Sequence, residues 1–145
     1  MEMPQMFRIL FAAALAAAQP LPALAGLQGA TLTIELQVKT HQGRVMIAIY
    51  DEAGWQGGKP VRVAMADAAP ARVAAEIAGL APGRYAVKLF QDLDGDGRMG
   101  SNPFGMPTEP FGFSRDAMGA AGQPAWADAA FEVTAAGATQ TITLR

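Results

Sequence analysis

Hydrophobic and polar residues alternate along several short segments of this chain. In residues 31–38 every second side chain is aliphatic, which is the period of a β-strand with one buried face. The pattern recurs in four further segments: 44–50, 84–90, 130–134 and 139–145. Gly137 supplies a turn between the last two. The polar stretch 39–43 contains a glycine and suits a hairpin connection, so we expect the first two strands to pair as an antiparallel hairpin.

Two further strands are indicated by weaker patterns, because alanines dilute the alternation at 61–65 and 72–77. A short helix over 64–75 is the competing interpretation, and Pro70 in its middle argues against it. The chain therefore predicts seven short strands separated by turn residues, which is typical of an all-β fold. We expect a seven-stranded antiparallel β-sandwich of immunoglobulin-like or prealbumin-like type.

Two stretches of the chain follow neither period. Residues 51–60 hold three glycines and a proline, which predicts a loop around Trp55. Residues 103–122 are rich in glycine, proline and phenylalanine, and long irregular excursions in compact domains are often functional. Their segment 104–114 is either an apolar lid or docking surface, or a loop whose own aromatic rings cap one end of the sandwich. We expect Trp55 or Trp126 to pack over such an end.

Residues 1–25 have the features of a secretory signal peptide. Residues 7–18 are apolar but too short to span a bilayer, and residues 23–25 (ALA) have the small-x-small pattern that signal peptidase accepts. We expect cleavage there, or else after Ala18, which leaves a single domain over 26–145. The mature protein is then expected to be periplasmic or secreted and to have no membrane span. An uncleaved membrane anchor is the alternative.

Composition argues against several classes of function. The net charge is −2 and no Lys/Arg cluster is present, so we expect no nucleic-acid partner, because such proteins need a basic face. With no cysteine there are no disulfides, thiolate zinc sites or cysteine nucleophiles. His41 is the only histidine, and we expect it in a solvated turn. Ser101 and Ser114 lie outside any Gly-x-Ser-x-Gly motif, which argues against a hydrolytic triad.

Four sequence features occur together in a pattern similar to that of a known family. They are IYD at 49–51, GLAPGRYAVKLFQDLDGDGRM at 79–99, GxPxEPFGFS at 105–114 and AAFEV at 129–133. With the signal peptide, they resemble the bacterial exported proteins grouped as domain of unknown function 2141, over nearly all of the mature chain. The Pro-Gly-x-Tyr-x-Val strand is also similar to prealbumin-like modules of bacterial surface proteins and carboxypeptidase tails. Both resemblances imply a β-sandwich, and neither implies an established activity.

An acidic loop follows the strand that carries this motif. Asp92, Asp94 and Asp96 match ligand positions 1, 3 and 5 of an EF-hand-type calcium loop, with glycine at position 6. Three carboxylates that converge without a counter-charge repel one another, so the pattern favours Ca²⁺. The alternative is that these aspartates only form the turn, and point into solvent or pair with Arg98 and Arg84.

The second half of the calcium motif is incomplete. Position 12 would be Pro103, so the bidentate glutamate of an EF-hand is missing. The remaining ligands would come from the Arg98 carbonyl, Asn102, water, or a later residue such as Glu109. Met99 could attach the loop to the core. Such a partial ligand set predicts weak binding, with a dissociation constant on the order of 10⁻⁴ to 10⁻³ M.

These observations lead to two functional hypotheses. The first is a non-enzymatic exported module that binds an unknown protein or glycan partner and has a calcium-ordered loop. The alternative is a small periplasmic hydrolase that uses loop carboxylates such as Asp94 and Glu109 as acid and base. An enzyme would hold Asp92, Asp94 or Glu109 in a concave pocket, whereas a structural loop would be convex and would stabilise the fold when metal binds. A carrier with a hydrophobic ligand inside the sandwich ranks last, because aligned sheets fill their core.

Overall fold

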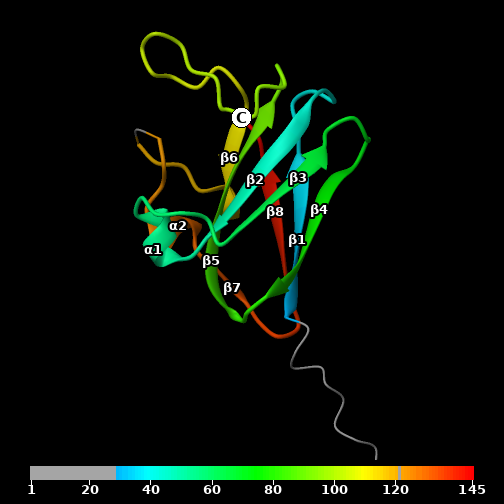
Figure 1. The fold of residues 1–145 in the computed structure, drawn as a ribbon, viewed down its shortest axis with the longest axis vertical. Helices are drawn as coiled ribbons and strands as arrows, with labels where there is room; N and C mark the ends of the chain where they lie inside the picture. Colours follow the sequence, from blue (N-terminus) through cyan, green and yellow to red (C-terminus); the bar gives the residue numbers. More distant parts are fainter. Residues whose placement is uncertain (1–28, 121) are drawn as a thin grey trace, which may run out of the picture.

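The computed structural model describes residues 29–120 and 122–145, which form two β-sheets and a few short helical turns (Figure 1). The expected signal peptide, residues 1–25, lies outside the described residues. Within the described part of the chain, no helix is long and apolar enough to cross a membrane.

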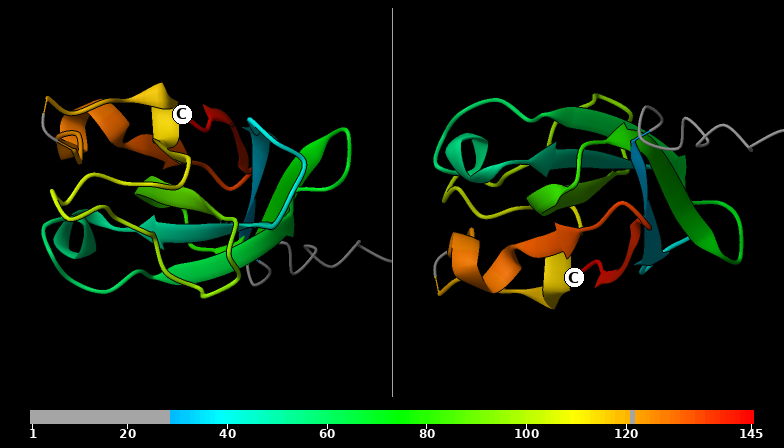
Figure 2. Two further views of the ribbon diagram at one scale, coloured as in Figure 1. Left: turned by 90° about the horizontal axis from the view of Figure 1, so that it is seen from above. Right: turned by 90° about the horizontal axis from the view of Figure 1, so that it is seen from below.

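The strands divide between a smaller and a larger sheet. The smaller sheet has the order β4-β1-β8, with β1 (Ala30–Gln37), β4 (Val73–Leu80) and β8 (Ala138–Thr143). The larger sheet has the order β3-β2-β5-β6, with β2 (Arg44–Tyr50), β3 (Arg62–Asp67), β5 (Gly83–Asp92) and β6 (Phe111–Phe113). The strand β7 (Phe131–Val133) also pairs with β5. Figure 2 shows the two layers from above and below.

The all-β prediction is confirmed, but two of its details are wrong. The described residues form eight strands rather than seven, because β6 arises inside the stretch 103–122, where the sequence shows no period. The strands are not all antiparallel either, since β1 and β8 run parallel. Because β3 and β4 are strands, the alternative of a helix over 64–75 is also wrong.

The predicted hairpin of the first two strands is wrong. The strand β1 pairs with β4 and β8, whereas β2 pairs with β3 and β5 in the other sheet. Both strands turn one face to the same core, so their alternation is satisfied in either arrangement. The connecting residues 38–43 therefore cross between the layers. Gly43 ends this crossing with φ +69°, where a Cβ atom would lie 2.1 Å from the Asp92 carbonyl oxygen.

The main hydrophobic core lies between the sheets. It contains the inward side chains of both sheets, among them Leu32, Ile34, Val45, Ile49, Val87, Val133 and Ile142. Tyr85, Val87 and Leu89, which alternate along β5, belong to this core. The one salt bridge of the described residues, Arg72 to Glu35 at 3.9 Å, is exposed. The fold therefore depends mainly on apolar burial.

A second apolar cluster covers one end of the opposite face of β5. It contains Trp55, Ala86, Phe113, Trp126, Ala129 and Ala130. The ring of Trp55, in α1 (Glu52–Trp55), makes an edge contact with that of Trp126, in α2 (Trp126–Ala129), at a centroid distance of 6.3 Å. Both tryptophans are buried, and they pack on this outer face of β5.

The segment 104–114 divides into a packed part and an exposed part. Phe111 and Phe113 lie in β6 and pack with the second cluster. Phe104 and Met106 instead point outward, with exposed fractions of 89% and 62%.

Ser114 ends the segment and begins the short helical turn η1 (Ser114–Asp116). Its buried hydroxyl accepts a hydrogen bond from the Val87 amide (2.9 Å) and donates one to the Ala129 carbonyl (2.6 Å). The bond from the Val87 amide lies between the part of β5 that pairs with β7 and the part that pairs with β6.

Candidate functional site

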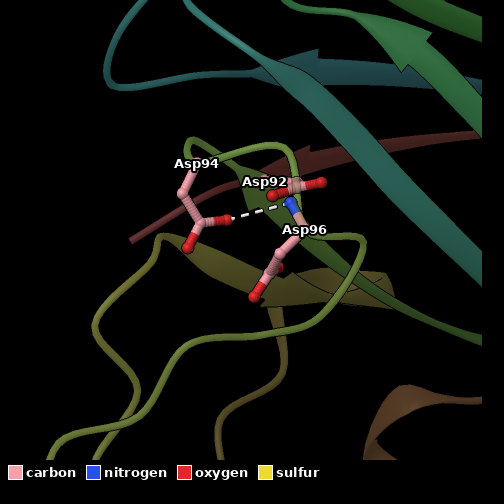
Figure 3. A group of neighbouring side chains, drawn as sticks. All are labelled: Asp92, Asp94 and Asp96. Atoms are coloured by element: carbon pink, nitrogen blue, oxygen red, sulfur yellow. Dashed lines mark hydrogen bonds between the residues drawn. The ribbon is translucent and has the colours of Figure 1, made fainter.

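The aspartate loop begins at the last residue of β5. Asp92 is buried, whereas Asp94 and Asp96 are exposed. Each of the three offers a carboxylate oxygen, and these oxygens all lie within 4.8 Å of one another. Figure 3 shows the three side chains gathered at this turn. The structure therefore brings together the three predicted principal ligands.

Backbone amides of the loop donate hydrogen bonds to the carboxylates of the loop itself. Asp92 accepts the amide hydrogens of Gly95 and Gly97, each at 2.9 Å. The Asp94 carboxylate accepts from the Asp96 amide at 3.2 Å, the bond drawn dashed in Figure 3. Gly95 and Gly97 adopt φ values of +77° and +72°, a region that glycine occupies without strain. The predicted turn-forming role of these residues is therefore present together with the clustering.

Crowding of the carboxylates shifts the pKa values of two aspartates in opposite directions. Burial opposes the charged form of Asp92, but the amides of Gly97 and Gly95 and a hydrogen bond with Asp94 outweigh it and lower its pKa. The Asp96 amide favours the charged form of Asp94. Hydrogen bonding to Asp92, desolvation and the charge of Asp96 outweigh this effect and raise the pKa of Asp94.

No basic side chain of the described residues neutralises the cluster. The alternative that the aspartates pair with Arg84 or Arg98 is not realised, because the salt bridge between Arg72 and Glu35 is the only one in residues 29–120 and 122–145. Arg98 is exposed and donates its backbone amide hydrogen to Asp96 at 2.8 Å. Its side chain therefore forms no ion pair with the cluster.

Glu109 lies outside the cluster and holds both ends of the loop. This buried carboxylate accepts the Leu93 amide hydrogen through Oε1 and the Gly100 amide hydrogen through Oε2, each at 2.9 Å. The group of oxygens within 4.8 Å of one another does not include those of Glu109. Glu109 thus connects the two ends of the loop through hydrogen bonds. The sequence carried no signal for that role.

Asn102 organises the next turn. Its side-chain oxygen accepts the amide hydrogens of Phe104 (2.9 Å) and Met106 (3.0 Å). The amide side chain thus shapes the tip that exposes both apolar residues. The side-chain oxygens of Asn102 and Glu109 thus accept backbone amide hydrogens outside the aspartate cluster.

The surface beside the loop is a shallow depression of about 540 Å³. Asp92, Asp94 and Asp96 border it together with Gly43 and Arg44. Glu109 does not border it, so Asp94 and Glu109 do not share this depression as an acid–base pair would. Asp92 and Asp94 thus border a concavity, as the hydrolase hypothesis expects of its carboxylates, but they do so without Glu109.

A second concavity lies on the outer face of the larger sheet and was missed at the level of sequence. Lys88 lies among its lining residues, and the groove has a volume of about 580 Å³. One signal was available: β2 is apolar on both faces, with Met46, Ala48 and Tyr50 alternating with buried aliphatic residues. A strand of that kind is covered on both sides or lines a binding surface.

The fold and the loop together define an all-β chain of two sheets with an aspartate cluster at the end of a central strand. A family model described as an uncharacterized protein conserved in bacteria (DUF2141) matches residues 34–142, and the chain belongs to this family. The match confirms the resemblance noted in the sequence. No curated protein and no solved structure matches the chain significantly.

Proposed function

We propose that this protein is an exported, non-enzymatic module of the immunoglobulin-like or prealbumin-like β-sandwich type. In this proposal the module binds a partner molecule, a protein or a glycan, and Ca²⁺ orders its aspartate loop. Export is supported by the signal-like pattern of residues 1–25, and the absence of cysteine is compatible with a domain that relies on its core.

One observation carries the calcium proposal. Three carboxylate oxygens lie within 4.8 Å of one another, and no basic side chain is paired with them in the described part of the chain. Ca²⁺ prefers oxygen ligands and tolerates an irregular set completed by carbonyls and water. Asp92, Asp94 and Asp96 would supply the anionic ligands, with the Arg98 carbonyl, Asn102 or Glu109 as possible additions.

Thermal unfolding with and without calcium tests this proposal. If the dissociation constant is about 10⁻³ M, calcium at about ten times that concentration should stabilise the wild type by about 1.4 kcal/mol. The double variant Asp94→Asn/Asp96→Asn should lose this response, while its buried Asp92 still supports the turn. An exposed aspartate outside the loop, Asp128→Asn, is the matched control. Equal melting temperatures with and without millimolar calcium in the wild type would remove the proposal.

The hydrolase alternative has less support. Both oxygens of Glu109 accept backbone amide hydrogens, and its carboxyl group does not border the depression beside Asp94. General acid–base catalysis needs two groups that reach the same substrate. We therefore propose calcium binding, rather than hydrolysis, for the loop carboxylates.

A further inference from the structure

The middle of the outer face of the larger sheet is apolar. Strand pairing places its residues in two rows that cross β3, β2, β5 and β6. One row is Met65, Met46, Phe90 and Phe111, and the next is Val63, Ala48, Lys88 and Phe113. Antiparallel sheets usually expose polar residues on the face that is away from the core. This face therefore has the composition of a covered surface, with Lys88 as the one charged residue in the two rows.

These rows form the floor of an open groove. Its volume is about 580 Å³, within the range of small-molecule sites, which are mostly apolar with a few placed polar groups. Tyr50, Met99 and Gln123 contribute to its sides. Val63 and Met65 remain 72% and 59% exposed, so protein atoms do not cover this end of the face.

Lys88 places a positive charge inside this groove. Its ammonium nitrogen lies 4.6 Å from the centre of the Tyr50 ring and 4.7 Å from that of the Trp55 ring. Both distances permit cation–π attraction, which holds the ammonium group over the sheet. Partial burial lowers the pKa of Lys88, because desolvation disfavours its charged form.

No anion of the described residues pairs with this ammonium group. Among residues 29–120 and 122–145, no carboxylate lies within 4.0 Å of the Lys88 nitrogen, and no hydrogen-bond acceptor is paired with it. Aromatic faces attract the charge but accept no conventional hydrogen bond. Because no described residue accepts a hydrogen bond from this half-buried ammonium group, its donors are available to one negative group of a ligand.

We propose that this groove binds a fatty acid, with the carboxylate on Lys88 and the hydrocarbon chain along the methionine and valine side chains. Charge complementarity selects this occupant. A neutral hydrophobe would leave Lys88 without an acceptor, and a cationic amphiphile would be repelled by it. The inference goes beyond the proposed function, because it adds a small-molecule ligand to the protein or glycan partner proposed above. It does not require calcium, because none of the three aspartates lines the groove.

Titration calorimetry with dodecanoate below its critical micelle concentration tests the proposal on protein expressed from the full coding sequence. Dodecyltrimethylammonium is the ligand control, since it has the same chain and the opposite charge. We expect saturable binding of dodecanoate with one ligand per chain and much weaker binding of the cation. Trp55 fluorescence should change in parallel, because its ring faces Lys88. Lys88→Met should weaken dodecanoate binding about tenfold or more, whereas the exposed Lys39→Met should not.

Three results would overturn the proposal. They are equal binding of the two amphiphiles, absence of dodecanoate binding, and a concentration-dependent dimer that Val63→Gln dissociates, which would mean that a second copy covers the face. The comparison of the two amphiphiles uses the wild type alone, so it stands even if Lys88→Met fails to fold. Each titration is run with calcium and with a chelator. Loss of dodecanoate binding in both conditions contradicts the groove, whereas an absent calcium effect on unfolding contradicts only the loop.

Discussion

Asp92 and Glu109 support the same loop from different positions. Asp92 accepts amide hydrogens from glycines inside the loop, whereas Glu109 accepts those of Leu93 and Gly100 at its two ends, each at 2.9 Å. Both carboxylates are buried at the end of the larger sheet. Glu109 therefore closes the loop, and Asp92 shapes its interior and faces the other aspartates.

Glu109→Gln should destabilise the protein by about 1–3 kcal/mol, because a glutamine amide can accept only one of the two backbone hydrogens and sets its own NH₂ group against the other. Urea unfolding measures the change. Glu132→Gln is the matched control, since Glu132 is an exposed residue of β7. Equal unfolding midpoints for the two variants would show that the hydrogen bonds of Glu109 do not stabilise the loop.

Asp94→Asn should stabilise the metal-free protein at neutral pH. The raised pKa of Asp94 means that its charged form is disfavoured in the folded state, so stability from this group is present at low pH and lost as pH rises through that pKa. Asparagine removes the charge and keeps an oxygen for the Asp96 amide. Melting curves in a chelator should show the gain at pH 7 and none at pH 3. A lower melting temperature at pH 7 would show that repulsion is not the dominant effect.

Asp92 should contribute stability with the opposite dependence on pH. Its pKa is lowered in the folded state, so its contribution is present above the unfolded value of about 3.9 and is lost as pH falls through the folded value. The difference in unfolding free energy between the wild type and Asp92→Asn should therefore be largest near neutral pH and shrink in acid. Denaturant unfolding at a series of pH values measures it. If this free-energy difference does not change with pH, the loss of stability in Asp92→Asn comes from altered packing and not from the lost charge.

Gly43→Ala should destabilise the fold more than Gly95→Ala. Both glycines have positive φ, at +69° and +77°, and this conformation alone disfavours alanine by about 1–2 kcal/mol. At Gly43 a Cβ atom would also lie 2.1 Å from the Asp92 carbonyl oxygen, whereas Gly95 has open space around it. Chemical denaturation of the two variants separates the collision from the backbone strain. Equal losses of stability in the two variants would show that residues 38–43 can move away from β5.

Local patterns predicted the strands well where one face is buried. The alternation of 44–50 and 84–90 marks β2 and β5, and the inward residues Val45 and Val87 lie in the main core. The short strand β6 could not be predicted, because its few residues include Gly112 and its pairing with β5 supplies the order. Period alone does not reveal a strand that exists only through its neighbour.

The candidate site was also predicted in part. The spacing of Asp92, Asp94 and Asp96 is local, so turn chemistry alone brings their carboxylates together. The relation of Glu109 to Leu93 and Gly100 depends on how the chain returns after the loop, which no local rule determines. Lys88 was missed because its aromatic neighbours, Tyr50 and Trp55, come from β2 and α1, which are distant from it in the sequence.

By itself, the sequence determined the all-β class, the family, the positions of the longer strands and the closeness of the three aspartates. All of these depend on contacts between residues that are near one another in the chain, or on a motif. Only the tertiary structure decided which sheet each strand joins, that β1 and β8 run parallel, and that an apolar groove surrounds Lys88. A period of two tells which face of a strand is buried. The identity of its neighbour depends on the packing of the whole chain.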